Sequence, residues 1–99
     1  MWTNRLLAFA AEVQAMPGRG QSRTSHRMTA ARLRAFADAA RATKDERPAD
    51  MLDKLAASVD AFAESPTWAP MTEANAAEVA TLLRAITKLV PTPAERGAA

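Results

Sequence analysis

Large hydrophobic side chains recur at helical spacing in four separate stretches of the chain. The most regular stretch predicts a helix over about residues 72–90, capped by Thr72 and stopped by Pro91. Its apolar residues share one face, and they are Val79, Leu82, Leu83, Ile86, Leu89 and Val90. A second stripe predicts a helix over about residues 48–64 and consists of Met51, Leu52, Leu55, Val59 and Phe62.

The N-terminal half holds two further helical patterns. One predicts a helix over about residues 3–16, ended by Pro17-Gly18, and its apolar positions are Trp2, Leu6, Phe9, Ala10 and Val13. The other predicts a helix over about residues 29–44, with Thr29 as its N-cap and only Leu33 and Phe36 as large apolar residues. We expect this helix to be the least buried and the most basic of the four.

The remaining segments have the composition of connections. Residues 17–28 contain two glycines and three hydroxyl residues without an apolar period, so we expect a linker. Residues 65–70 are too rich in proline for a helix, and Trp68 is expected to anchor this loop on the core. Residues 91–99 are expected to form a polar tail.

These patterns predict an all-α fold, because no stretch alternates with the period of two that is typical of a strand. We expect a single domain over residues 1–99, built as a bundle of about four helices. The third and fourth helices are predicted to form an antiparallel hairpin, with the first helix packed on it and the second on its flank. The predicted core combines their stripes: Leu55, Val59, Phe62, Val79, Leu82, Leu83 and Ile86.

Composition adds a constraint on packing, because alanine supplies 25 of the 48 hydrophobic residues. Alanine favours helices but buries little surface, so the helices are expected to approach one another closely. The apolar start at residues 6–11 is too short to span a membrane, and we expect a cytoplasmic protein that does not contact membranes. Ten arginines against three lysines, with so much alanine, are typical of a GC-rich bacterium or its phage.

Candidate chemistry is sparse, and we expect neither an enzyme nor a bound cofactor or metal. The chain has no cysteine and one histidine, which excludes the usual zinc ligand sets. His26 lies in the predicted linker beside Ser22 and Ser25, where a flexible segment cannot preorganise a catalytic site. We expect His26 to be a solvated loop residue. The carboxylates of Glu46, Asp50 and Asp53 lie among basic neighbours and are expected to be solvated.

Charge is divided unevenly along the chain. Five arginines and no acid lie between Glu12 and Asp38, whereas all the charged residues between Lys54 and Arg84 are acidic. The formal charge is nine bases minus four acids, or +5, over residues 1–47, and four minus seven, or −3, over residues 48–99. This asymmetry indicates either an anionic partner or a match between the two halves.

Three interpretations of the basic segment stay open. The favoured one is a small helical adaptor or inhibitor that docks on an acidic protein surface through Arg19, Arg23, Arg27, Arg32 and Arg34, with Trp68 as a further contact. It requires Arg23, Arg27 and Arg34 to face outward. The alternative is a nucleic-acid-binding accessory protein that uses the same arginines on phosphates.

The third interpretation is internal pairing of these arginines. Their partners would be Asp60, Glu64, Glu73 and Glu78 of this chain or of a symmetric copy, which leaves a homo-oligomer open. Glu64 in particular is predicted to need an arginine, because its carboxylate lies at the negative end of a helix.

Overall fold

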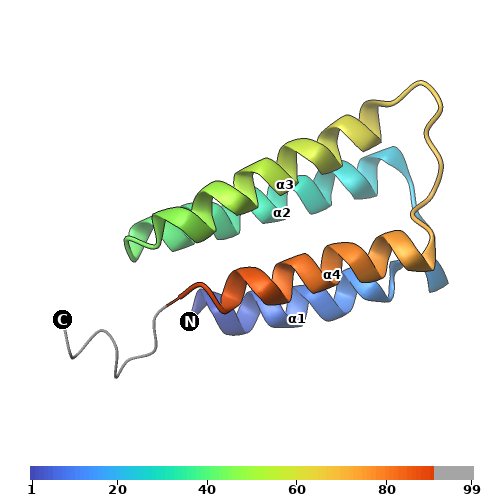
Figure 1. The fold of residues 1–99 in the computed structure, drawn as a ribbon. Helices are drawn as coiled ribbons and strands as arrows, with labels where there is room; N and C mark the ends of the chain where they lie inside the picture. Colours follow the sequence, from blue (N-terminus) through green and yellow to red (C-terminus); the bar gives the residue numbers. More distant parts are fainter. Residues whose placement is uncertain (91–99) are drawn as a thin grey trace.

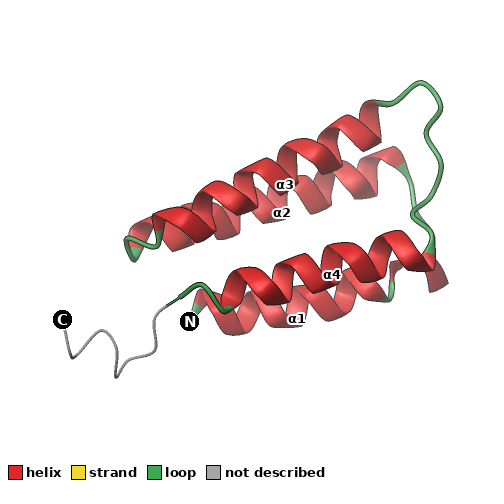
Figure 2. Cartoon of the chain, viewed as in Figure 1, coloured by secondary structure: helices red, strands yellow, loops and turns green. Residues whose placement is uncertain are grey.

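The computed structural model describes residues 1–90, which form four α-helices and no strand. The helices are α1 (Trp2–Gln14), α2 (Arg23–Ala42), α3 (Glu46–Glu64) and α4 (Glu73–Thr87), and a short 3-10 turn, η1 (Met16–Gly18), follows α1. Figure 2 shows a tight turn between α2 and α3 and a longer loop between α3 and α4. The prediction of a small all-α bundle is confirmed. The predicted polar tail, residues 91–99, lies outside the described range.

The helices form two layers, each an antiparallel pair (Figure 1). One layer is α2 against α3, and the other is α1 against α4. The predicted hairpin of the third and fourth helices is therefore wrong. The reason lies in the connections, because a short turn after Ala42 folds α3 back on α2, whereas residues 65–72 are long enough to reach the other layer.

The turn between α2 and α3 is fixed by its backbone. Lys44 adopts a left-handed conformation with φ 63°, and the Asp45 N–H donates to the Ala40 carbonyl at 2.9 Å. The Lys44 N–H donates to the Arg41 carbonyl, also at 2.9 Å, which completes the helix-ending pattern known as a Schellman motif. The chain reverses here without a glycine, at a modest steric cost to Lys44.

The start of α2 differs from the prediction by six residues, since the helix begins at Arg23 and not at Thr29. Ser22 and Ser25 cap each other. The Ser25 N–H donates to the Ser22 hydroxyl at 3.0 Å, and the Ser22 N–H donates to the Ser25 hydroxyl at 2.8 Å. Residues 23–28 of the predicted linker are therefore helical, and they carry His26 into the structured part of the molecule.

Alanines allow the two helices of each layer to pack closely. Fully buried alanines lie on every helix: Ala10, Ala30, Ala37, Ala40, Ala49, Ala56, Ala63, Ala76 and Ala80. The largest fully buried apolar side chains fill the space among them, and these are Leu6, Val13, Leu33, Leu52, Leu83 and Ile86. The expected close approach of alanine-rich helices is confirmed.

The predicted core is only partly correct. Val59, Leu83 and Ile86 are buried, but Leu55, Phe62 and Val79 are half-buried. Leu82 is 43% exposed. These differences have one cause: α3 and α4 belong to different layers, so their facing stripes line the seam between the layers instead of meeting in a closed core.

Candidate protein-binding surface

Most of the basic segment contacts acidic side chains of the same chain. Arg27 pairs with Glu64, and Arg34 pairs with Asp60 at 2.6 Å. The hydrogen bond from Arg27 holds the pKa of Glu64 below its ordinary value, and Glu64 in turn raises the pKa of Arg27. The sequence-based expectation that Glu64 has an arginine partner is confirmed.

The same row of ion pairs continues toward the turn. Arg41 lies seven residues after Arg34 and contacts Asp50 at 3.0 Å and Asp53 at 2.5 Å. Since seven residues are nearly two helical turns, Arg27, Arg34 and Arg41 share one side of α2 and face the acidic side of α3. The positive half of the chain therefore matches the negative half within one helical pair.

Two other arginines of the segment are also engaged. Arg23 donates to the carbonyls of Ala63 and Ser65, at 3.1 and 2.8 Å, and so satisfies the C-terminal end of α3. Arg32 contacts Glu12 at 2.7 Å, and its guanidinium carbon lies 4.1 Å from the centre of the Phe9 ring.

The expectation that Arg23, Arg27 and Arg34 present themselves outward to a partner is therefore not favoured, because each already contacts α3 or its end. Arg19 is exposed and forms no ion pair within residues 1–90. Internal pairing is only partly as anticipated. Within residues 1–90, Glu73 and Glu78 form no ion pair with these arginines, whereas Glu12, which was not among the expected partners, pairs with Arg32.

His26 is fully buried, so the prediction of a solvated loop residue is wrong. Its Nδ1 atom accepts from the indole N–H of Trp68 at 2.9 Å, and its Nε2 atom lies 2.7 Å from Oε1 of Gln21. An indole nitrogen can only donate, so Nδ1 carries no proton and Nε2–H donates to Gln21. Burial lowers the pKa of His26, which further favours this neutral form.

This histidine fixes the loop between α3 and α4. Trp68, the expected anchor of the loop on the core, is half-buried, and its indole N–H donates to the buried His26 of α2. Gln21 binds both backbone groups of Met71: Oε1 accepts from the N–H at 2.9 Å, and Nε2 donates to the carbonyl at 3.1 Å. The His26 ring also lies 5.1 Å from the Phe62 ring. The contacts with His26 and Gln21 therefore fix the positions of Phe62 and Met71.

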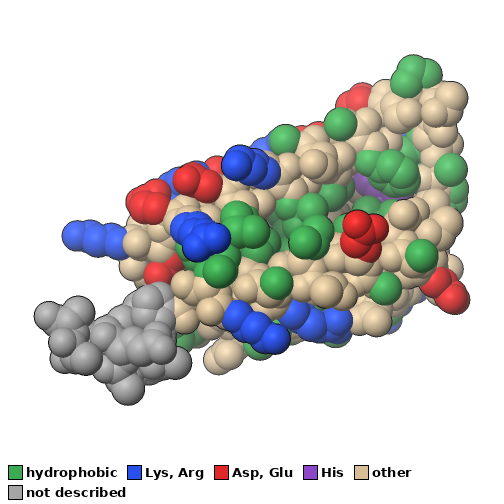
Figure 3. Space-filling model, viewed as in Figure 1, with side chains coloured by type: hydrophobic (Ala, Val, Ile, Leu, Met, Phe, Trp, Pro, Cys, Tyr) green, Lys and Arg blue, Asp and Glu red, His purple; other side chains and the backbone are tan. Residues whose placement is uncertain are grey.

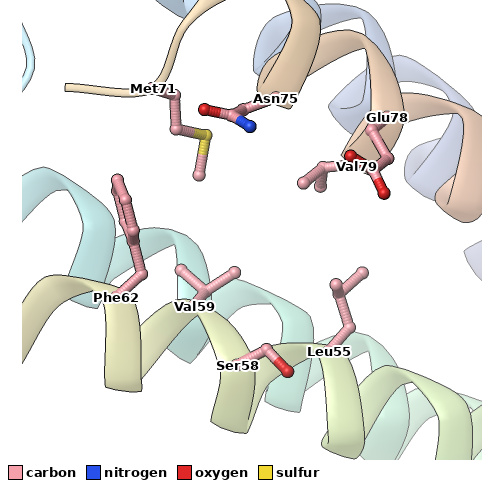
Figure 4. Close-up of a pocket in the computed structure, with 8 residues that line it drawn as sticks. All are labelled: Leu55, Ser58, Val59, Phe62, Met71, Asn75, Glu78 and Val79. Atoms are coloured by element: carbon pink, nitrogen blue, oxygen red, sulfur yellow. The ribbon is translucent and has the colours of Figure 1, made fainter. Parts of the chain in front are cut away.

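Phe62 and Met71 form one end of an apolar groove between α3 and α4. The first hollow of the groove measures about 190 Å³, and Figure 4 shows Leu55, Val59 and Phe62 projecting toward Met71 and Val79. A second hollow of about 240 Å³ adjoins it and shares Leu55 and Ser58. Its other lining residues are Met51, Lys54, Leu82 and Ile86. Figure 3 shows the resulting band of hydrophobic side chains between the layers.

Two charged residues lie on the rim of this groove. Glu78 of α4 lines the first hollow, and Lys54 of α3 lines the second. Both are exposed, and neither forms an ion pair with any residue of the described part of the chain. The groove therefore combines an apolar floor with one unpaired anion and one unpaired cation.

Four residues that line the groove belong to the predicted core but are not fully buried: Leu55, Phe62, Val79 and Leu82. The signal that distinguishes them is the breadth of the apolar surface of α3, which is too wide for one neighbour. Its alanines, Ala49, Ala56 and Ala63, are buried fully, whereas the larger Met51, Leu55 and Phe62 are only half-buried. Two apolar faces on one helix indicate two contact surfaces.

No group of three metal-ligating side chains is present in residues 1–90. None of the four helices is long and apolar enough to cross a membrane. No family model, curated protein or solved structure matches the chain.

Proposed function

We propose that this protein is a non-enzymatic helical adaptor or inhibitor that binds a protein partner in the groove between α3 and α4. The observation that carries the proposal is the groove itself, where Leu55, Phe62 and Val79 stay half-buried because no element of residues 1–90 covers them. Covering apolar surface contributes about 25 cal/mol per Å² removed from water. An apolar helix or hairpin is the kind of element that fits between two helices in this way.

The groove is a better candidate than the arginine segment. A partner that captured Arg27 and Arg34 would have to break their contacts with Glu64 and Asp60, and it would leave two carboxylates unpaired. The same objection applies to nucleic acid, because phosphates would compete with those carboxylates for the same guanidinium groups. Filling the groove breaks no ion pair.

A matched pair of leucines tests the proposal. Leu82 lies in the groove and Leu7 lies on α1 outside it, and both are 43% exposed. Leu82→Lys should reduce the recovery of partners at least about tenfold when the protein is used as bait in an extract of its native host. Leu7→Lys should leave recovery unchanged. Quantitative mass spectrometry compares the two variants with the original chain.

The arginine interpretations have their own arm in the same experiment. Arg27→Gln combined with Arg34→Gln should keep the partners that Leu82→Lys loses, and treatment of the extract with nuclease should not release them. Partners that survive Leu82→Lys but are lost from the double arginine variant would overturn the groove proposal. Partners released by nuclease and by moderate salt would instead favour the nucleic-acid function.

A further inference from the structure

The partner in the groove is a second copy of this chain: we propose a two-fold symmetric dimer in which the α3/α4 grooves of two molecules face each other. This inference rests on the proposed function and names its partner. In a two-fold dimer the same patch is used on both sides, so the patch must be complementary to itself. The lining of the groove meets that condition in both its apolar surface and its charges.

The apolar surface of the groove has both a protruding side chain and two hollows. Leu82 stands 43% exposed beside the second hollow, and Met51 and Val79 are half-buried nearby. The hollow beside Phe62 and Met71 belongs to the same face. A face that carries both protruding leucine and open hollows can fill itself when it is duplicated.

The charges of the patch are balanced. Its lining residues include one cation, Lys54, and one anion, Glu78, while all the others are neutral. A strongly acidic or strongly basic partner would meet one like charge here as well as one opposite charge. An identical face supplies one charge of each sign, as the patch requires.

The placement of these two charges suits a two-fold axis. Lys54 is on α3, one helical turn, or about 6 Å, before Ser58 of the first hollow, whereas Glu78 is on α4 at that hollow. The two residues are therefore at diagonally opposite positions on the rim. An axis that lies in the plane of the face, perpendicular to the line between them, exchanges their positions. Lys54 of each copy then faces Glu78 of the other, which forms two equivalent ion pairs.

The test is sedimentation velocity on the full chain at about 100 μM, where a micromolar dissociation constant gives mostly dimer. The original chain should be dimeric. Glu78→Lys and Lys54→Glu each place like charges across the axis twice, so each should raise the dissociation constant at least about tenfold. An equimolar mixture of the two variants should restore dimers, because their charges are then opposite at both contacts. Glu73→Lys, on the same helix but outside the groove, should leave the dimer unchanged.

Each contrary result has a distinct meaning. A monomeric original chain overturns the second copy as partner, and the proposed function survives if Leu82→Lys still loses captured proteins while Leu7→Lys does not. If the original chain is monomeric and Leu82→Lys also captures the same proteins as the original chain, the groove is not a binding surface. A dimer that Glu78→Lys, Lys54→Glu and Leu82→Lys all leave intact uses another face. A mixture that stays monomeric overturns the diagonal pairing. Thermal unfolding of each variant alone verifies that the helices are intact.

Discussion

The two seams between the helical layers are built differently. The seam between α1 and α2 is crossed by Arg32, which joins Glu12 and covers the Phe9 ring, and Phe9 in turn lies 5.7 Å from Phe36. The seam between α3 and α4 has no hydrogen bond or ion pair across it within residues 1–90. Arg32 divides the first seam into two hollows of about 250 and 180 Å³, and it lines both of them. The two hollows of the second seam adjoin each other at Leu55 and Ser58, with no such side chain between them.

The difference shows how one bundle combines stability with an available surface. The apolar stem of an arginine covers aromatic surface while its charged end stays in water, so Arg32 shields Phe9 from solvent. Leu55 and Val79 cannot reach across the other seam in that way. What remains uncovered there is suited to contact with another molecule.

The largest expected effect separates the buried core from the edge of the groove between α3 and α4. Leu83 is fully buried, so Leu83→Ala should lower the free energy of unfolding by about 2–5 kcal/mol. The neighbouring Leu82 is 43% exposed, and Leu82→Ala should lower it by less than about 1 kcal/mol. Denaturant unfolding of dilute protein measures both values. Equal losses would mean that the groove edge is part of a closed core.

The sequence predicted the helices better than their pairing. Thr72 and the Ser65-Pro66 pair mark helix limits, as predicted, because capping and proline effects are local. Pro48 lies in the first turn of α3, as predicted, but the helix begins two residues before the predicted start, at Glu46. Pairing depends on which face of a helix meets which neighbour, and α3 has two apolar faces. The face of α3 that carries its fully buried alanines lies within the layer that α3 forms with α2. A hydrophobicity pattern gives these small residues little weight and is dominated by the large residues of the other face. The assignment of α3 to α4 followed the larger residues.

The site was harder to predict for a related reason. His26 is buried only because Ser22 and Ser25 cap a helix that starts earlier than the apolar pattern does. Hydroxyl residues serve both as caps and as loop residues, so the pattern alone did not separate these roles. The partners of the arginines, in contrast, followed from charge: the internal match named Asp60 and Glu64, and both are found in ion pairs.

The next effect concerns the end of the groove held by His26. Burial lowers the pKa of His26 from its ordinary value of 6.5, so the unfolded chain takes up a proton before the folded chain does. The contribution of His26 to stability is therefore complete above about pH 6.5 and declines as the pH falls below it. A proton on Nδ1 would also face the indole N–H of Trp68, which breaks that hydrogen bond.

Two measurements check this expectation. His26 is the only histidine, so NMR can follow its imidazole directly, and its resonance should titrate below pH 6.5. His26→Ala leaves Trp68 and Gln21 without their partner and should lower the free energy of unfolding by about 1–3 kcal/mol near neutral pH. The difference between the two proteins should shrink as the pH falls toward about 5. A difference that stays constant over that range would contradict the assignment of a neutral, buried imidazole.

The smallest expected effect is at the seam between α1 and α2, which Arg32 crosses. Arg32→Ala removes the contact with Phe9 and the ion pair with Glu12, and should lower the free energy of unfolding by under about 1 kcal/mol. Arg32→Lys keeps a charged end and an apolar stem, so it should lower the free energy of unfolding by less than Arg32→Ala does. Glu12→Gln removes only the charge of the carboxylate and therefore measures the ion pair alone. Because an ion pair between exposed side chains is screened by salt, the Glu12→Gln effect should shrink at high ionic strength, whereas the cover that Arg32 gives to Phe9 should persist. A loss from Arg32→Ala as large as that from Leu83→Ala would mean that Arg32 supports the core and does more than bridge α1 and α2.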